Sequence, residues 1–393
     1  MTTATTSGDL QLENRVEALL DLATRAGADA ADATVFGSDQ ISVGRRMGQV
    51  ETLERADSAG VDLRVFLNGQ IAQVSGSDLT DNGLARLAER AVGMAKYSPA
   101  DAFAQLADPD QLAQNLPILE TFDPVEPSTG AMLDRAAEAE EAMLGVEGIT
   151  NSGGVSAGWT KSSLVIATTN GFLGSVQSTR HGLSVSGIAG EGEAQKRDYD
   201  YSLAVFGEDL KDPREIGLEA GRRSVRQLGA KPGATAQVPV IFEPRVAVRM
   251  FSLLMGAING ESLVRGTSLL ADHIGKTVIA PELSVFEDPF LKRALGSRPF
   301  DGEGLPVQEN TLFDQGVLTT HLHNLATAKQ AGVNPTGHAS RGGASIGIGY
   351  ANAWLSPSEQ SVDDMLKDAG EAFYVTSLMG QGRRRRRRVH VRA

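Results

Sequence analysis

The chain of 393 residues contains no cysteine, and aromatic residues make up only 5% of it. The absence of cysteine excludes a disulfide framework, a thiolate metal ligand and a thiol nucleophile. No apolar stretch reaches the roughly 18 residues that a membrane-spanning helix needs. The first ten residues also lack the basic start and apolar run of a secretory signal. The sequence therefore predicts a cytoplasmic protein that does not cross a membrane.

Basic residues are scarce except at the C-terminal end. The chain has 37 lysines and arginines against 49 acidic residues, for a formal net charge of −12. Seven arginines fall in the last eleven residues, so the remainder carries a net charge of −19. An acidic body argues against nucleic acid as the main partner, because basic side chains supply most phosphate contacts. The run Arg383–Arg388 by itself is typical of a disordered basic tail or a nucleic-acid-binding arm.

Glycine is abundant, with 44 residues, and favours many turns and closely packed strands. The length suits two or three domains. The fold class that the patterns predict is α+β, with two N-terminal units of helices on an antiparallel sheet, then a larger, mixed, β-rich C-terminal domain. The predicted boundaries are an N-terminal domain 1–97, a linker 98–127, a central domain 128–230, a C-terminal domain 231–382 and a disordered tail 383–393.

Local signals predict the individual elements. Helices are expected where apolar residues repeat every three to four positions next to capping residues. They are residues 11–26, a helix from Thr80, residues 128–144, a helix from Asp212-Pro213 and a helix from Pro244. Short strands are expected at residues 33–36, 49–55, 61–67, 70–75, 155–160, 163–169, 174–179, 183–189 and 238–242. Asn68-Gly69 is a strong hairpin signal.

None of the six histidines is followed by glutamate, so the chain has no HExxH or HExxxH motif. The one close pair is His321 and His323, in a strand-like run. On a strand the two side chains would point to the same face and could share a metal ion. The favoured interpretation is that they pack beside the sheet as two partly exposed histidines.

The glycine-flanked loop Thr336–Gly342 contains His338, Ser340 and Arg341. Such a loop could line a cleft and hydrogen-bond to a peptide backbone, or it could be a simple turn. With His321 and His323, these three residues are the candidates for contacts in a peptide-binding cleft. A G-x-S-x-G nucleophile elbow is absent from the sequence, so a serine hydrolase is not predicted.

Asp301 and Glu303 belong to the sequence FDGEG. The simplest interpretation is a turn in which Asp301 accepts hydrogen bonds from its own backbone. In the alternative, the two acids hold a loop at a cleft or at a partner surface.

Longer motifs point to a known family. The sequences FDGEG, TGHASRG and FYVTSLMGQG follow one another between Phe300 and Gly382. The N-terminal third adds RRMGQVETLERADSAG and GVDLRVFLNGQIAQVSGS between Arg45 and Ser77. In this order the motifs resemble the TldD/PmbA family over roughly residues 12–382. They are most similar to its PmbA branch, also called TldE and described as modulators of DNA gyrase.

The resemblance implies a function for the chain. In this family, a zinc-bearing TldD subunit carries a helical HExxxH motif, and its complex with a PmbA-like subunit cleaves unfolded peptides. By this resemblance the motif would fall on an expected helix over Phe251–Gly266, which here is FSLLMGAINGESLVRG and contains no histidine. The resemblance therefore implies a subunit with no catalytic residue, metal ligand or cofactor of its own. Its partners would be a TldD-like zinc subunit, in a hetero-oligomer, and an unfolded peptide, and self-association is also expected to be possible.

Two other functions stay open. The chain could be an independent hydrolase that uses its histidines, or a regulator that binds nucleic acid or a topoisomerase. The resemblance also bears on the C-terminal end, because family members continue beyond the MGQG motif with further strands. Here the sequence changes character at Arg383, which predicts a truncated or frameshifted end.

Overall fold

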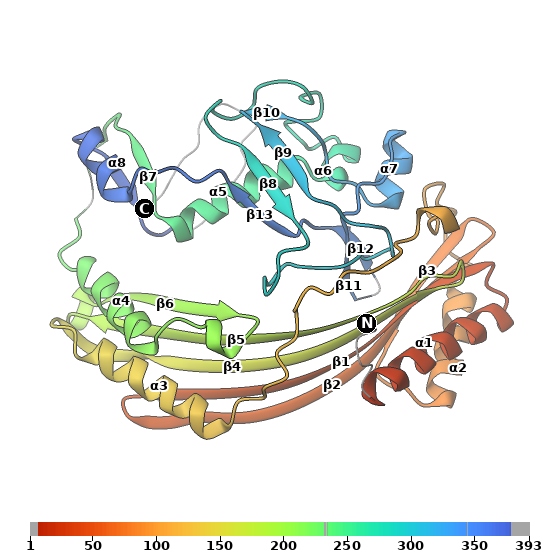
Figure 1. Ribbon diagram of the computed structural model, residues 1–393, viewed down its shortest axis with the longest axis horizontal. Helices are drawn as coiled ribbons and strands as arrows, with labels where there is room; N and C mark the ends of the chain where they lie inside the picture. The colour runs from red at the N-terminus through yellow and green to blue at the C-terminus, as the bar shows by residue number, and fades with distance from the viewer. Residues whose placement is uncertain (1–6, 232, 234, 344, 379–393) are drawn as a thin grey trace. The chain divides into compact units, whose positions relative to one another are not determined.

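The computed structural model describes residues 7–231, 233, 235–343 and 345–378 (Figure 1). The predicted disordered tail and the predicted frameshift lie outside these residues. The chain forms two compact units. Of the described residues, unit 1 contains those within 1–230, 287–310 and 323–352, and unit 2 contains those within 231–286, 311–322 and 353–393.

Unit 1 is built on one six-stranded sheet with the order β3-β2-β1-β4-β5-β6. All of its neighbouring strands are antiparallel. The strands are β1 (Ala30–Arg46), β2 (Gln49–Leu67), β3 (Gln70–Gly76), β4 (Ile149–Thr168), β5 (Leu173–Ala189) and β6 (Lys196–Ala204). The α+β prediction is confirmed, and the pairing of β1 with β4 joins the two predicted sheets into one.

Two helix pairs cover a single face of this sheet (Figure 1). Ala33 and Val35 of β1 lie in the first apolar core, and Ile41 and Val43 lie in the second. Because alternate strand residues point to the same face, both cores are on one side of the sheet. The first core contains residues of α1 (Ser7–Arg25) and α2 (Asp81–Ala95), and the second contains residues of α3 (Thr129–Leu144) and α4 (Pro213–Arg226).

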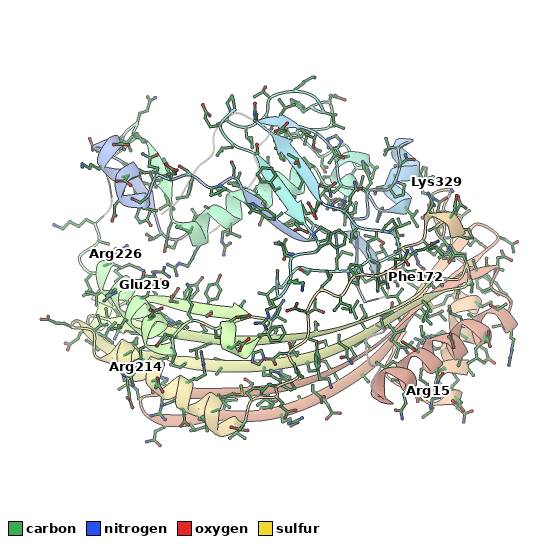
Figure 2. The ribbon with its side chains drawn as sticks, viewed as in Figure 1. Arg15, Phe172, Arg214, Glu219, Arg226 and Lys329 are labelled. Carbon is green, nitrogen blue, oxygen red and sulfur yellow. The ribbon has the colours of Figure 1, made fainter. Side chains whose placement is uncertain are left out.

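Ion pairs connect the two helices of each pair at their outer surface. Arg15 of α1 pairs with Asp81 at the start of α2. Arg214 of α4 lies 3.5 Å from Glu138 of α3. Figure 2 labels Arg15 and Arg214 on these helices. Exposed pairs of this kind contribute about 0–1 kcal/mol each, so the apolar cores beneath them provide most of the stabilisation.

Two-residue turns join the strands of the first half of the sheet. Asn68 and Gly69 connect β2 to β3 with φ of 51° and 76°, which confirms the predicted hairpin. Met47 and Gly48 connect β1 to β2 with φ of 48° and 78°. Positive φ at both central residues matches the right-handed twist of the flanking strands.

The predicted strand 70–75 agrees with β3, but the other predicted lengths in unit 1 are wrong, because β1, β2, β4 and β5 are much longer. Residues 155–160 and 163–169, for example, belong to the single strand β4. Ser162 and Ser163 interrupt the β-forming pattern, yet they pair with β1 on one side and with β5 on the other. Backbone pairing on both sides outweighs the low strand preference of individual residues.

The helix-free face of the sheet is partly covered by other segments of unit 1. Ile166 of β4 packs with Phe172 and Phe300, whose rings meet edge-on with centroids 5.0 Å apart. The segment 98–127 has one regular element in the described structure, the 3-10 helix η1 (Pro109–Gln111). Unit 1 also contains the 3-10 helices η2 (Gly192–Ala194) and η3 (Gly207–Asp209), helix α7 (Leu325–Ala331), and strands β11 (Ala339–Gly342) and β12 (Ser345–Ile348).

Unit 2 has a short parallel pair, β7 (Val240–Phe242) with β14 (Phe373–Val375), and the helices α5 (Pro244–Ala257), α6 (Gly260–Val264) and α8 (Val362–Ala369). The single helix expected over Phe251–Gly266 is wrong. Helix α5 ends at Ala257, and the Asn259 side chain accepts a hydrogen bond from Glu261 N at 2.9 Å to begin α6. Asparagine favours such a cap because its side-chain oxygen replaces a missing backbone acceptor.

A four-stranded sheet has the order β10-β9-β8-β13. Its strands are β8 (Val285–Asp288), β9 (Asn310–Asp314), β10 (Val317–Leu318) and β13 (Asn352–Leu355). The chain passes from one unit to the other within β8, β9 and β13. No helix in the described ranges is long and apolar enough to cross a membrane.

Candidate functional site

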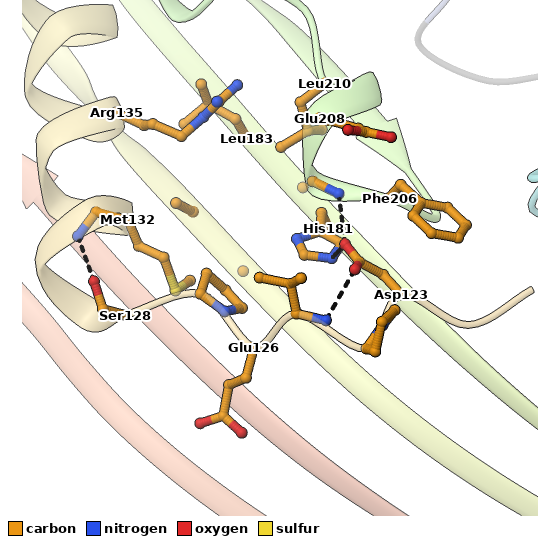
Figure 3. A pocket seen from close by; sticks show the side chains of 18 of the residues that line it. Asp123, Glu126, Ser128, Met132, Arg135, His181, Leu183, Phe206, Glu208 and Leu210 are labelled. Carbon is orange, nitrogen blue, oxygen red and sulfur yellow. Dashed lines mark hydrogen bonds and ion pairs between the residues drawn. The ribbon is translucent and has the colours of Figure 1, made fainter. Parts of the chain in front are cut away.

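A pocket of about 650 Å³ lies in unit 1 (Figure 3). Its walls come from the segment before α3, the first turns of α3, strand β5 and the turn η3. Ser128 begins α3 by accepting a hydrogen bond from Ala131 N at 3.1 Å. Met132 and Arg135 both line the pocket because residues three apart share one face of a helix.

Asp123 fixes one wall of the pocket. Its side chain accepts hydrogen bonds from Val125 N at 2.9 Å and from Gly207 N at 3.0 Å. His181 Nε2 lies 3.1 Å from Asp123 Oδ2, within ion-pair distance but without the alignment of a hydrogen bond. His181 is 5% exposed. Burial lowers the pKa of His181, while the nearby Asp123 carboxylate opposes this change.

The other charged side chains at the pocket differ in their pairing. Glu126 pairs with Arg55 at 2.6 Å, and Glu208 pairs with Arg293 at 2.7 Å. Arg135 has no carboxylate partner among the described residues. It donates to Lys211 O at 3.1 Å, and its Nε is buried without a hydrogen-bond partner. This cation is therefore available to a ligand.

A second group of polar residues lies in the interior of unit 1, and we call it the buried ion cluster. It contains Asp32, Arg64, Glu287, Asp301, Glu303, His338 and Arg341. His338 Nε2 lies 2.7 Å from Glu287 Oε2, and its Nδ1 lies 2.8 Å from Thr336 Oγ1. Glu287 also accepts a hydrogen bond from Ala351 N at 2.6 Å. Burial raises the pKa of Glu287, but these hydrogen bonds outweigh burial and lower it.

The FDGEG segment forms the centre of the cluster. Asp301 Oδ1 accepts hydrogen bonds from Glu303 N at 2.9 Å and Leu305 N at 3.0 Å, as predicted for a turn. Its Oδ2 accepts one from Ala339 N at 3.0 Å, which attaches the turn to β11. Burial raises the pKa of Asp301. Burial also raises the pKa of Glu303 to about 7, although Arg64 opposes the change.

Ion pairs connect this turn to the sheet. Asp32 of β1 is fully buried and accepts hydrogen bonds from Arg64 Nε at 2.7 Å and Arg341 Nη2 at 2.8 Å. Arg64 Nη2 also lies 3.7 Å from Glu303 Oε1. Burial raises the pKa of Asp32, but the two guanidinium groups outweigh burial and lower it. The cluster thus fastens the FDGEG turn and β11 to the sheet of unit 1.

The structure brings two of the five predicted cleft residues to Thr336, which accepts a hydrogen bond from His323 N at 2.7 Å and lies 2.8 Å from His338 Nδ1. His338 is 2% exposed, Ser340 is half-buried in β11, and the side chain of Arg341 is 7% exposed. His323 is buried with Nδ1 3.2 Å from Thr327 Oγ1, and His321 of unit 2 has Nε2 3.0 Å from Leu270 O. Their assignment to a peptide cleft stays a prediction.

The prediction that a strand carries His321 and His323 is wrong. Strand β10 ends at Leu318, and only the intervening Leu322 makes an isolated bridge, to Asn259. Within the described ranges, no three His, Asp or Glu side chains are grouped so that they could hold a metal ion. The predicted lack of a metal site in this chain stays a prediction.

Sequence reasoning missed the pocket residues Asp123, Arg135 and His181. One signal was present in the sequence. His181 alternates with Leu183 and Val185, which are core residues, so the period of two places the histidine on the helix-covered face. Asp123 and Arg135 carried no comparable signal, because their roles depend on contacts far away in the sequence.

The chain matches known protein families over most of its length. Residues 31–95, 122–228 and 235–388 match the models of PmbA/TldA metallopeptidase domain 1, of its central domain and of its C-terminal domain. The metalloprotease PmbA of Escherichia coli O157:H7 is 34% identical over 372 residues, which cover 94% of this chain and 81% of that protein. The chain belongs to the PmbA/TldD metallopeptidase family.

Solved structures of similar fold agree with this membership. A candidate modulator of DNA gyrase from Bacteroides thetaiotaomicron superposes with a TM-score of 0.87 at 25% identity, covering 96% of this chain and 84% of that one. TldE from Thermococcus kodakarensis has a TM-score of 0.83 at 19% identity, covering 93% and 83%, and shows the same fold. The three matched segments and the two compact units divide the chain differently, so the predicted domain boundaries stay a prediction.

Proposed function

We propose that this chain is a PmbA/TldE-like subunit of a cytoplasmic peptidase complex. A TldD-like partner subunit holds the zinc ion, and the complex degrades or processes unfolded peptides. Family membership supports the proposal, together with the similarity to proteins named metalloprotease PmbA and TldE. In this proposal the chain itself supplies binding surface and assembly contacts.

The observation that carries the proposal is the lack of histidine in α5 and α6, whose one carboxylate in α6, Glu261, pairs with Arg265. In the zinc-bearing branch, the resemblance places an HExxxH motif on the matching helix. A metal site of this type needs two imidazoles on one helix face and a carboxylate that activates water. Here α5 offers Phe251, Leu254 and Met255, and it ends before Asn259. Side chains of these types neither bind zinc nor accept a proton from water, so the chemistry must come from another subunit.

The predicted cleft residues take a supporting part in the proposal. His338 bonds to Glu287 and Arg341 bonds to Asp32 of β1, and Ser340 lies between them in the sequence and is half-buried. We expect these residues to shape the peptide-binding surface, as the sequence suggested. The same expectation for His321 and His323 rests on the sequence alone.

A peptide-cleavage assay tests the proposal. An unfolded peptide is incubated with this chain, with a zinc-loaded TldD-like protein from the same host, and with both. We expect fast cleavage only in the mixture, and loss of cleavage when the glutamate of the partner's HExxxH motif is replaced by glutamine. Equal rates for the mixture and the partner alone would refute the role of this chain as a subunit.

The alternative of an independent metal-dependent hydrolase is tested by elemental analysis. After dialysis against zinc-containing and then zinc-free buffer, we expect no stoichiometric zinc on the isolated chain. About one tightly held zinc ion per chain, with chelator-sensitive cleavage by the chain alone, would favour the independent hydrolase instead.

A further inference from the structure

We propose that the pocket beside α3 binds an organic carboxylate with an apolar body, and that Arg135 binds its carboxylate group. This site goes beyond the proposed peptidase function, because nothing in that function requires a ligand here. The proposal rests on the pairing of charges around the pocket, on the start of α3 and on the apolar walls.

The pairing of charges selects the sign of the ligand. The carboxylates that line the pocket already have partners. Asp123 accepts two backbone N–H groups beside His181, and Glu126 and Glu208 each pair with an arginine. Arg135 alone among the lining cations of the described structure lacks a carboxylate, since Arg293 pairs with Glu208. Arg135 is therefore the lining cation that can pair with the carboxylate of a ligand.

The guanidinium group of Arg135 suits the same ligand. A carboxylate is the anion that a guanidinium binds best, because the guanidinium fork matches its two oxygens. One of the terminal nitrogens already donates to Lys211 O, which holds the side chain in place.

The start of α3 also favours an anion at this wall. The N-cap residue Ser128 and Ala131 in the first turn of the 16-residue helix line the pocket. The N-terminal end of a helix carries a partial positive charge that attracts carboxylates.

The remaining walls of the pocket are apolar and favour a ligand with an apolar body. They include Val125, Met132, Leu183, Phe206 and Leu210. The volume of about 650 Å³ lies within the range of roughly 300–1,000 Å³ that is typical of small-molecule sites. The chemistry fits the free C-terminal end of an apolar peptide, and it also fits a free aliphatic acid, so the experiment compares both sources.

Tryptophan fluorescence offers a direct binding assay. Trp159 of β4 pairs across the sheet with the pocket residue His181. The chain has two tryptophans, so the variant Trp354→Phe leaves Trp159 as the single reporter. The probes are N-acetyl-leucyl-phenylalanine, its C-terminal amide and octanoate, and calorimetry on the same samples measures binding if the fluorescence does not change.

We expect the acid to bind saturably and the amide to bind about tenfold more weakly or worse, because only the acid pairs with Arg135. Arg135→Ala should reduce acid binding to the level of the amide, and Arg135→Lys should restore part of it. The matched control Arg214→Ala removes an exposed arginine of α4 and should leave binding unchanged. Circular dichroism confirms that each variant is folded.

The results show whether the ligand is a peptide end or a free aliphatic acid, and they can also overturn the proposal. Binding of the peptide acid without octanoate identifies a peptide end, and binding of octanoate without the peptide acid identifies an aliphatic acid. Binding of both supports the site with broad selectivity. Equal binding of acid and amide, full binding by Arg135→Ala, or no binding of any probe by calorimetry would overturn the proposal. None of these results depends on peptidase activity, so the proposed function is tested separately.

Discussion

The buried ion cluster and the pocket beside α3 lie in the same unit and use the same kinds of side chain, but they differ in pairing. In the cluster, Asp32 holds two guanidinium groups and Glu287 holds a histidine and a backbone N–H. In the pocket, Arg135 has only a backbone carbonyl as partner. Complete pairing indicates a role in holding the fold, and incomplete pairing indicates room for a ligand. Variants of the two regions should therefore differ most in stability and in binding.

The largest effect is expected for Asp32→Ala. Removing this carboxylate leaves Arg64 and Arg341 buried near Glu303 without their main partner, which costs about 3–5 kcal/mol. Urea unfolding monitored by circular dichroism measures the loss. The control Asp81→Ala breaks only the exposed pair with Arg15 and should cost about 0–1 kcal/mol. Equal losses would mean that the cluster is no more important than a surface ion pair.

A somewhat smaller effect is expected for His338→Ala. The variant removes the imidazole 2.7 Å from Glu287, so the buried carboxylate loses a strong hydrogen-bond partner. We expect the free energy of unfolding to fall by about 1.5–3 kcal/mol. An unchanged unfolding midpoint would show that water or Asn310, which also donates to Glu287, replaces the histidine without loss.

The pH dependence of stability should reveal Glu303. Its folded pKa of about 7 lies above the model value of 4.5, so the folded state binds this proton more tightly. The contribution of Glu303 to stability is therefore full below pH 4.5 and is lost as the pH rises towards 7. Between pH 4.5 and 7, the unfolding free energy of the wild type should therefore fall by about 1–3 kcal/mol relative to that of Glu303→Gln. A difference that stays constant between pH 4.5 and 7.5 would contradict the raised pKa.

The smallest effect is expected for Arg135→Ala in the absence of ligand. The side chain has one hydrogen bond to a backbone carbonyl and an unsatisfied Nε, so its removal should change stability by less than about 1 kcal/mol. Chemical unfolding of Arg135→Ala and of Asp32→Ala under the same conditions compares the loss of unfolding free energy in the two regions. A loss as large as that of Asp32→Ala would place Arg135 among the residues that hold the fold.

Local sequence signals predicted the ends of helices well. Thr80, Ser128 and Asp212 each cap a helix through a side-chain oxygen, as their residue types and positions indicated. The Asp301 turn was predicted for the same reason, because an aspartate accepts bonds from backbone two residues on. These features depend on neighbours in the sequence, which periodicity and residue type report directly.

Features that depend on distant residues were not predictable in this way. The pairing of β1 with β4 merges two sheets, yet it leaves no local pattern in either strand. Sequence reasoning singled out His338 and Arg341 because of their loop, but their burial follows from contacts with Glu287 and Asp32. The pocket was missed because its walls come from segments that are distant in the chain.

The contact between Asp32 and Arg341 joins residues that are 309 positions apart. Ribosomes add about 5–20 residues per second, so roughly 15–60 s pass between the synthesis of these two residues. During that time the nascent sheet carries Asp32 and Arg64 without their final partner, and Ile166 and Phe172 without Phe300. We therefore expect the newly made N-terminal part to need protection by chaperones, and stop codons placed before Arg341 to yield aggregating fragments rather than a smaller folded protein.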